Sequence, residues 1–343
     1  MDRGSAVTRP RLGLWLGAFV GFYRPGVEEV RRLDPVSKFL YAGRSVILVI
    51  SAQAALVAGL LAAADREFAW LPFALVLAGF VVAHMISNFS NDYFDWRRGH
   101  DTPDSPRMRY TVHPLASGVL ERGTLLAGLA ILSLAGLAIT AFFVVERGAL
   151  AVAFAAAGVA LLLLYDAAPV PLKAIGLGEA AAFAVWGPLM VGGGYAMIAG
   201  HVSSTAFLAA VPYGLGVMSI LVGKHIDQLE FDAARGTRTL PVVIGERAAR
   251  SLSAAAIVLI YAAIAALIAG GRLTPFAALA ALGLPRAIRA LQILSRPRPA
   301  AAPAGYVGWP LWYHRACLLH HRAFGWAYLA GLAAGVVSSA WRG

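Results

Sequence analysis

Four polar side chains recur at helical spacing where a long apolar segment ends. They follow the apolar run 71–86, and they are Asn88, Asn91, Asp92 and Asp95. Their spacing of i, i+3, i+4 and i+7 places all four on one face of a helix that continues through them. Polar groups at the end of a membrane helix cost free energy unless they are paired or reach water, so they indicate a functional site. Carboxylates and amides offer oxygen ligands, which favours Mg²⁺ over zinc.

A second acidic stretch follows a later apolar span. It contains Asp227, Glu230 and Asp232, and it closes near Gly236, a residue type that commonly ends a helix. Asp227 and Asp232 are five residues apart, which is a poor spacing for one helical face. Asp227 with Glu230, or Gln228 with Asp232, fits a helix better.

Many basic residues accompany these two acidic stretches. Carboxylates alone would hold Mg²⁺, and basic side chains alone would hold phosphate. Together they indicate a Mg²⁺–diphosphate site, in which the metal bridges phosphate oxygens and Arg or Lys neutralises the remaining charge. A diphosphate met at the end of membrane helices is expected to be carried on a lipid. The candidate basic ligands are Arg98, Arg107, Arg109, Lys224 and Arg238.

The composition is that of a polytopic membrane protein. Of the 343 residues, 59% are apolar and 14% are charged, and the mean hydropathy is +0.69. Soluble domains are nearer 45–50% apolar and about 25% charged. The single cysteine, Cys317, excludes an intrachain disulfide. The formal net charge of +11 would suit nucleic acid, but the arginines lie in loops between apolar spans. We therefore expect no nucleic-acid partner and assign these charges to topology and phosphate contact.

Nine apolar segments are close to the ~20 residues needed to cross a bilayer. They are residues 40–63, 70–91, 124–145, 148–165, 177–199, 204–222, 250–270, 274–294 and 322–340. The acidic stretch after the second segment recurs after the sixth, four spans later. This favours an all-α fold of two four-helix pseudo-repeats plus a last helix, arranged around a central cavity with the acidic ends together.

The distribution of charge predicts the orientation in the membrane. With the N-terminus inside, every Lys and Arg lies on the inner side except Arg66, Arg147, Arg272 and Arg342, as the positive-inside rule requires. We expect an integral protein of a prokaryotic inner or plasma membrane, with the N-terminus and the polar motifs on the cytoplasmic side.

The chain divides into two parts by composition. Residues 1–39 are predicted to form a basic cytoplasmic or interfacial segment, because its apolar run 12–23 is too short to span. Residues 40–343 are predicted to form the transmembrane domain.

Five short motifs, in a fixed order between residues 88 and 245, resemble those of the UbiA superfamily of intramembrane prenyltransferases. The stretch 91–95, with Gly99 and Asp101, resembles the first aspartate-rich motif. The stretch 113–118 is similar to the family's Arg-Pro-Leu-x-Ser-Gly step, with His113 in place of the arginine, and 232–245 resembles the end of the second motif.

Two further stretches, 165–169 and 176–179, resemble the MenA branch, which prenylates 1,4-dihydroxy-2-naphthoate on the way to menaquinone. A further position, besides His113, departs from the family pattern. Gln228 stands where the second motif usually has aspartate, and Asp227 lies one place earlier, so a one-residue irregularity in the helix would be needed to restore it.

The resemblance implies a Mg²⁺-dependent transfer of a polyprenyl group from a prenyl diphosphate to an aromatic acceptor. It implies that Mg²⁺ is bound by Asp92, Asp95, Asp101, Asp227 and Asp232. It also implies a catalytic role for each of these residues except Asp101. It implies substrate contacts by Asn88, Asn91, Arg98, Arg107, Arg109, Tyr165, Lys224 and Arg238. The implied partners are the two substrates and membrane lipid; the oligomeric state is not predicted.

Three alternatives stay open from the sequence. A member of the same family could prenylate 4-hydroxybenzoate, homogentisate, a porphyrin or a phosphosugar. A transporter for an anionic or Mg²⁺-bound solute would also place acidic residues in a helical bundle. A non-catalytic binding protein of the same shape is the third.

Overall fold

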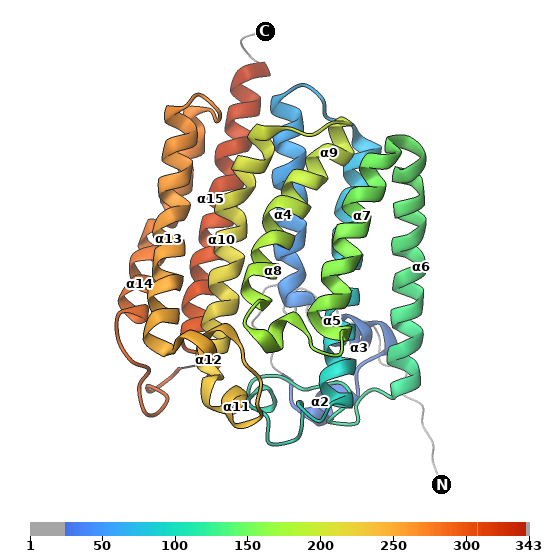
Figure 1. The fold of residues 1–343 in the computed structure, drawn as a ribbon, viewed down its shortest axis with the longest axis vertical. Coiled ribbons are helices and arrows are strands. Elements are labelled where there is room, and N and C mark those ends of the chain that lie inside the picture. The colour runs from blue at the N-terminus through green and yellow to red at the C-terminus, as the bar shows by residue number, and fades with distance from the viewer. Residues whose placement is uncertain (1–24, 307, 341–343) are drawn as a thin grey trace.

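The computed structural model describes residues 25–306 and 308–340, and within them every regular element is a helix. Long helices stand side by side in one bundle, and the longer connections gather at one end of it, together with the short helices α2, α3, α11 and α12 (Figure 1). The predicted all-α class is confirmed. The apolar run 12–23 lies outside the described residues.

The helices follow the predicted spans closely. Their bounds are α2 Val27–Arg31, α3 Pro35–Ala42, α4 Ser45–Ala64, α5 Trp70–Arg97, η1 Pro106–Arg109, α6 Arg122–Arg147, α7 Ala149–Leu162, η2 Leu163–Ala167, η3 Leu172–Ile175, α8 Gly178–Ala184, η4 Val185–Gly192, α9 Gly193–Ala199, α10 Ser204–Asp227, α11 Leu229–Ala234, α12 Leu240–Ile244, α13 Glu246–Ala269, η5 Pro275–Gly283, α14 Leu284–Leu294 and α15 Tyr313–Ala340.

The described chain crosses the bundle nine times. Eight helical segments within it are long and apolar enough to span a membrane. The ninth crossing is α15, which is 28 residues long but whose histidines and arginines lower its hydropathy. Because α3 lies at the looped end and α15 finishes at the opposite end (Figure 1), the number of crossings is odd.

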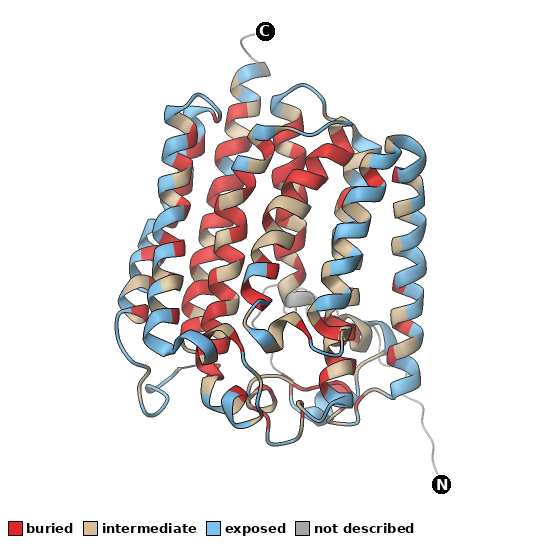
Figure 2. Ribbon diagram, viewed as in Figure 1, coloured by how far each residue is buried: buried red, intermediate tan, exposed pale blue. Residues whose placement is uncertain are grey.

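The outer surface of the bundle is apolar, as lipid contact requires. On α6, Ile131, Leu134 and Leu137 recur three residues apart and are each more than 60% exposed. Figure 2 shows the inner helices α4, α10 and α15 largely buried, with exposed residues concentrated on outer helices such as α6. A contiguous exposed apolar belt of this kind is expected where lipid, and not water, is the solvent.

Glycine allows α10 and α15 to approach closely near the looped end. A side chain at Gly223 would place its Cβ 2.8 Å from the backbone nitrogen of His314, a distance that real Cβ atoms do not reach. The small residue therefore brings the start of α15 against the end of α10. The close approach places Asp227, near the end of α10, beside the first backbone nitrogens of α15.

Two spans depart from regular α-helix where they face the interior. The α7 span ends in the wide π-helical turn η2, and the span from α8 to α9 contains the π-helical segment η4, with Pro188 inside it. Proline removes a backbone donor from the helix, and π-helical turns are frequent at functional sites. These turns carry Tyr165 and Trp186, which both line the cavity described next.

Candidate active site

A cavity of about 1910 Å³ opens within the bundle. Its interior wall is mostly apolar, and its looped end is lined by charged and amide side chains. Those side chains include Asn88, Asn91, Asp95, Asp101, Lys224 and Asp232. Most of the predicted site residues therefore meet at one end of a long apolar chamber.

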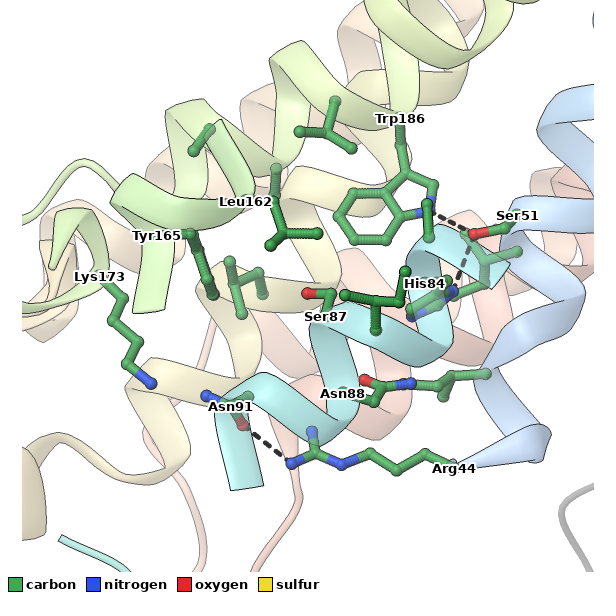
Figure 3. Close-up of a pocket in the computed structure, with 18 of the residues that line it drawn as sticks. Arg44, Ser51, His84, Ser87, Asn88, Asn91, Leu162, Tyr165, Lys173 and Trp186 are labelled. Atoms are coloured by element: carbon green, nitrogen blue, oxygen red, sulfur yellow. Dashed lines mark hydrogen bonds between the residues drawn. The ribbon is translucent and has the colours of Figure 1, made fainter. Parts of the chain in front are cut away.

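Helix α5 continues through the first polar motif, as its spacing predicts. Asn91 is the central residue of the resulting face: its Nδ2 donates to Asp95 Oδ2 and to Asp166 Oδ1, each at 2.9 Å. Its Oδ1 accepts from Arg44 Nη2 at 2.8 Å (Figure 3). Asn88 donates instead to the backbone oxygen of Gly43 at 3.0 Å, and so joins α5 to the end of α3 while still lining the cavity.

Asp95 is held by a lysine from the connection between the α7 and α8 spans, in the short helix η3. Lys173 Nζ lies 2.7 Å from Asp95 Oδ1 and 2.6 Å from Asp166 Oδ1. Burial disfavours the ammonium, but the charges of Asp95 and Asp166 outweigh it and raise the pKa of Lys173. The space between the two carboxylates therefore accepts a cation.

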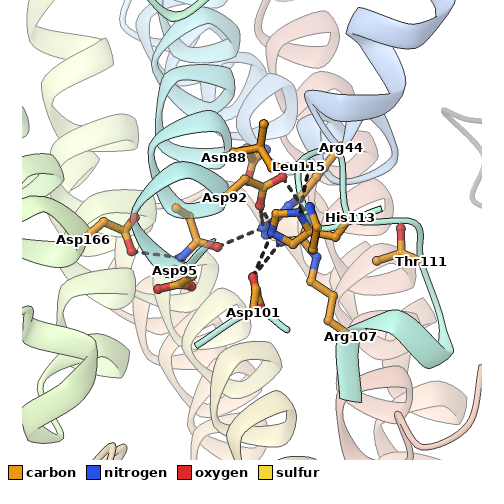
Figure 4. Close-up of polar contacts among 12 residues, drawn as sticks. Arg44, Asn88, Asp92, Asp95, Asp101, Arg107, Thr111, His113, Leu115 and Asp166 are labelled. Atoms are coloured by element: carbon orange, nitrogen blue, oxygen red, sulfur yellow. Dashed lines mark hydrogen bonds and ion pairs between the residues drawn. The ribbon is translucent and has the colours of Figure 1, made fainter. Parts of the chain in front are cut away.

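Asp92 differs from Asp95 in its environment. Its side chain is fully buried and does not line the cavity. Arg107 Nη1 and Nη2 approach its two oxygens at 2.5 and 2.9 Å, and Arg44 forms a further ion pair (Figure 4). Arg44 reaches it from a left-handed backbone conformation with φ 54°, which is uncommon for a residue with a side chain. Asp92 therefore joins α5 to the loop that follows it.

Asp101 belongs to the same loop. Arg107 Nη1 lies 3.3 Å from Asp101 Oδ2, and His113 Nε2 lies 3.1 Å from that oxygen (Figure 4). His113 Nδ1 accepts from the backbone nitrogens of Leu115 and Ala116, so its ring carries the proton on Nε2, facing Asp101. Burial opposes ionisation of Asp101, but the contact with His113 and the charge of Arg107 outweigh it and lower the pKa of Asp101. His113 thus fulfils a positioning role where the family pattern has arginine.

Asp232 brings the second acidic stretch to the first. His100 Nε2 lies 3.7 Å from Asp232 Oδ1, and Thr239 Oγ1 donates to Asp232 Oδ2 at 3.3 Å. Burial raises the pKa of Asp232, which nearby His225 and Lys224 only partly counteract. The two acidic stretches therefore lie together at the mouth of the cavity, as predicted.

The predicted basic residues other than Arg107 differ in their surroundings. Lys224 lines the cavity, and its ammonium makes no hydrogen bond or ion pair with the residues that the structure describes. Arg98 lines the cavity too and donates to the backbone oxygens of Asp166 and Ala168 at 2.6 and 2.8 Å, which fixes the η2 turn. Arg109 is exposed at the mouth, whereas Arg238 is exposed and does not line the cavity.

Asp227 turns away from the cavity. A break does occur at Gln228, between α10 and α11, but it does not direct Asp227 inward. Its Oδ1 and Oδ2 accept from the backbone nitrogens of Tyr313 and His314 at 3.1 and 2.9 Å, so it caps the start of α15. The structure assigns it a different role from the metal binding expected of it.

The capping role of Asp227 leads to a prediction. Asp227→Ala should lower the free energy of unfolding by about 1–2 kcal/mol, because two backbone donors of α15 lose their acceptor. The Mg²⁺ concentration needed for activity should stay the same. Thermal unfolding in detergent and a Mg²⁺ titration measure the two effects, with exposed Glu230→Ala as the control. A raised Mg²⁺ requirement at unchanged stability would show that Asp227 binds metal after all.

Residues outside the predicted motifs complete the site. Lys173 and Arg44 entered the sequence argument only as topology charges, yet they neutralise Asp95, Asp166 and Asp92. A usable signal for Lys173 is that it is the only basic residue between the fourth and fifth predicted spans and follows Tyr165 and Asp166 closely. No comparable sequence signal identifies Arg44.

The donor atoms at the cavity end fit Mg²⁺. Asp95, Asp101 and Asp232 offer carboxylate oxygens, and Asn91 offers an amide oxygen, which are the ligands that this ion prefers. Within the described part of the chain, no three acidic, histidine or cysteine residues form a ready-made metal cluster. The arrangement suits an ion that keeps water and phosphate oxygens among its ligands, as Mg²⁺ usually does.

The sequence profile described as the UbiA prenyltransferase family matches residues 52–314. The chain is a member of this family. The family membership confirms the predicted prenyltransferase class and favours it over the transporter alternative.

Several relatives carry names of different prenyltransferases. The 1,4-dihydroxy-2-naphthoate octaprenyltransferase of Haemophilus influenzae is 28% identical over 189 residues, 52% of this chain and 59% of that protein. The digeranylgeranylglyceryl phosphate synthase of Natronomonas pharaonis is 33% identical over 54% of this chain and 60% of that protein. The UbiA prenyltransferase domain-containing protein 1 of Dictyostelium discoideum is 25% identical over 64% of this chain and 68% of that protein.

Solved UbiA homologues share the fold. The apo homologue from Aeropyrum pernix superposes with a TM-score of 0.61 at 18% identity, covering 85% of this chain and 97% of that chain. A homologue from Archaeoglobus fulgidus bound to GPP and Mg²⁺ superposes with a TM-score of 0.55 at 15% identity, covering 86% of this chain and 99% of that chain. At these identities the comparison confirms the membrane-embedded helical fold of this UbiA-family protein.

Proposed function

We propose that this UbiA-family prenyltransferase transfers a polyprenyl group from a prenyl diphosphate to an aromatic acceptor, and that the acceptor is 1,4-dihydroxy-2-naphthoate. The observation that carries the proposal is the two-part cavity. One end presents oxygen ligands and the ammonium of Lys224, which has no partner among the described residues; this suits a Mg²⁺–diphosphate. The remaining wall is apolar, which suits a prenyl tail.

Two comparisons support the finer parts of the proposal. A homologous structure holds GPP and Mg²⁺, which supports the prenyl diphosphate and the metal. Relatives named 1,4-dihydroxy-2-naphthoate octaprenyltransferase occur in three bacteria, which supports the naphthoate and a bacterial plasma membrane. The charge distribution supports a cytoplasmic position for the polar cavity end, by the positive-inside rule.

The chain's own residues would act chiefly through charge and shape. Asp95 and Asp232 would hold Mg²⁺, with Asp101 beside them, and Mg²⁺ supplies charge that stabilises the departing pyrophosphate. Lys224 and Lys173 add positive charge at the same place. The bond from the allylic carbon to the diphosphate oxygen breaks, and its electron pair leaves with the pyrophosphate. The acceptor ring then forms the new bond to that carbon, and the attacked ring carbon loses its own substituent, a proton to water or a carboxylate as CO2, so that the ring becomes aromatic again.

The apolar wall protects the carbocation-like transition state from water. Tyr165 lines the cavity beside the charged end, with Lys173 Nζ 6.0 Å from its ring centre. An aromatic face near a developing cation contributes about 0.5–2 kcal/mol. Exclusion of water also prevents hydrolysis of the prenyl group.

The acceptor panel is the deciding experiment. Purified protein with Mg²⁺ and radiolabelled geranylgeranyl diphosphate should form a prenylated product with 1,4-dihydroxy-2-naphthoate. It should form none with 4-hydroxybenzoate, homogentisate or geranylgeranylglyceryl phosphate. A product with geranylgeranylglyceryl phosphate alone would instead favour a function like that of the relative from Natronomonas pharaonis. Failure with every aromatic acceptor would contradict the proposal.

Removal of metal should stop the same reaction. EDTA is expected to reduce turnover to background, because carboxylates at the cavity end would repel the diphosphate without a bridging cation. Excess Mg²⁺ should restore turnover, whereas Zn²⁺ should restore little, since the donors are all oxygen. Activity that persists in EDTA after dialysis would refute the metal requirement.

A further inference from the structure

A second polar group lies in the cavity wall, away from the charged end. It consists of Ser51 on α4, His84 on α5 and Trp186 in η4, three residues from three different spans. All three line the cavity, and Figure 3 shows them on the side of the chamber beyond Ser87 and Asn88. Polar side chains within membrane spans are costly and therefore indicate a function.

The three residues form one chain of hydrogen bonds. Trp186 Nε1 donates to Ser51 Oγ at 3.3 Å, and Ser51 Oγ lies 2.8 Å from His84 Nδ1 (Figure 3). The His84 and Trp186 rings meet edge to face, with centroids 5.2 Å apart. Contacts from two other spans thus fix the orientation of the imidazole.

The direction of these bonds determines what His84 offers to a ligand. An indole nitrogen only donates, so Ser51 Oγ accepts from Trp186 and has its own proton left to donate. His84 Nδ1 is the only other partner of that hydroxyl among the described residues. Nδ1 is therefore the acceptor, and the neutral ring carries its proton on Nε2. Nε2 has no partner in the described part of the chain, and His84 lines the cavity, so Nε2 is a donor available to the cavity.

The depth of His84 suits the head group of an acceptor. It lies one helical turn from Asn88 and about 10 Å along α5 from Asn91, at 1.5 Å per residue. The allylic carbon of a prenyl diphosphate is bonded directly to a phosphate oxygen and so lies just inside the charged end. An aromatic ring that touches this carbon can place an oxygen substituent at His84. A hydrocarbon tail has no hydrogen-bond acceptor, so a tail at this place would leave the N–H of His84 unsatisfied.

We propose that Ser51, His84 and Trp186 form the acceptor head-group site, in which His84 Nε2 donates to a hydroxyl, carbonyl or carboxylate oxygen of the aromatic acceptor. The indole of Trp186 borders the site and packs against the imidazole of His84. This inference rests on the proposed function and extends it by naming the residues that position the acceptor. Since Ser51 and Trp186 act by orienting the imidazole, they are positioning residues.

The test separates the affinities of the two substrates. His84→Leu should raise the KM for the aromatic acceptor about tenfold, the effect of one lost hydrogen bond of ordinary strength. The KM for prenyl diphosphate should change less than about twofold, because the charged end is untouched. His84→Gln retains an amide donor of similar reach and should recover most of the affinity. Ser51→Ala should give an intermediate increase, because the ring stays present but is no longer oriented.

The matched control is a second membrane histidine. His320 on α15 also makes a contact between spans, to Tyr261 Oη at 3.0 Å, but it does not line the cavity. His320→Leu should leave the acceptor KM unchanged. An unchanged acceptor KM in His84→Leu, or an equal rise for both substrates, would overturn the inference while the proposed function stands.

A binding measurement keeps the inference testable without turnover. Calorimetric titration with 1-hydroxy-2-naphthoate, in the presence of pyrophosphate and Mg²⁺, should show binding to the wild-type protein that is about tenfold weaker in His84→Leu. If the wild-type protein prenylates no aromatic compound, the proposed function fails, and this titration decides the inference alone. Absence of binding, or equal binding by both proteins, would refute it.

Discussion

Replacing Asp95 with asparagine should reduce prenyl transfer about a thousandfold without unfolding the protein. Removing a single charge-stabilising group from an active site typically costs 10²–10³ in turnover. Asp95 lines the cavity and accepts hydrogen bonds from Asn91 and Lys173. Together with Asp166 it holds the Lys173 ammonium, which shows that a cation is stable at this place. The amide keeps the shape and the contact with Asn91 but loses the negative charge.

The measurement is turnover at saturating substrates over a range of Mg²⁺ concentrations, with thermal unfolding as a check on the fold. The matched control is Asp104→Asn, because the Asp104 side chain is 75% exposed and contacts Arg235 on the loop surface. That variant should keep its activity. Turnover of Asp95→Asn within tenfold of wild type would remove Asp95 from the proposed metal site.

Replacing Arg107 with alanine should lower the free energy of unfolding by about 3–5 kcal/mol, which is typical for breaking a buried ion pair. Asp92 is fully buried, and the loss of Arg107 leaves it with Arg44 as its only cationic partner of those described. Burial disfavours the guanidinium, but the charges of Asp92 and Asp101 outweigh this and raise the pKa of Arg107. The guanidinium of Arg107 therefore stays charged in the pair.

Thermal unfolding in detergent measures this loss, and exposed Arg97→Ala is the control. The double variant Asp92→Leu/Arg107→Met should recover a large part of the stability, because a buried pair can be replaced by apolar residues with little net cost. If Arg107→Ala unfolds at the same temperature as wild type, the pair is not structural.

The same cluster predicts how stability depends on pH. The folded protein lowers the pKa of Asp101 below its ordinary value, so Asp101 stabilises the fold at pH values above that ordinary value. The contribution is lost as the pH falls through the lowered value. Asp101→Asn should therefore reduce stability at neutral pH, and the difference from wild type should shrink in strong acid.

Much of this site follows from local rules. The spacing of Asn91 and Asp95 predicts their common face, since a helix repeats every 3.6 residues and α5 runs on without interruption. The hydropathy predicts the spans, because lipid admits only helices with apolar surfaces here. The gathering of the acidic stretches at one end follows from counting the crossings.

The roles of individual acids could not be predicted in this way. Asp92 and Asp95 lie on the same helical face and belong to one motif, yet the first is enclosed by arginines and the second reaches the cavity. Asp227 lies only one place away from the position at which the second motif usually has aspartate. It caps α15, a helix that begins some 85 residues later, because Gly223 lets that helix come close.

The sequence by itself determined the membrane class, the crossings, the end of the bundle at which the polar residues lie and the oxygen-donor chemistry of the first motif. Each of these depends on composition or on spacing within one helix. Only the tertiary structure decided which cation meets which carboxylate, that Lys173 bridges Asp95 and Asp166, and that His84 offers a donor to the cavity. These contacts join spans far apart in the chain, and their geometry is set by how the helices pack, which helical periodicity does not encode.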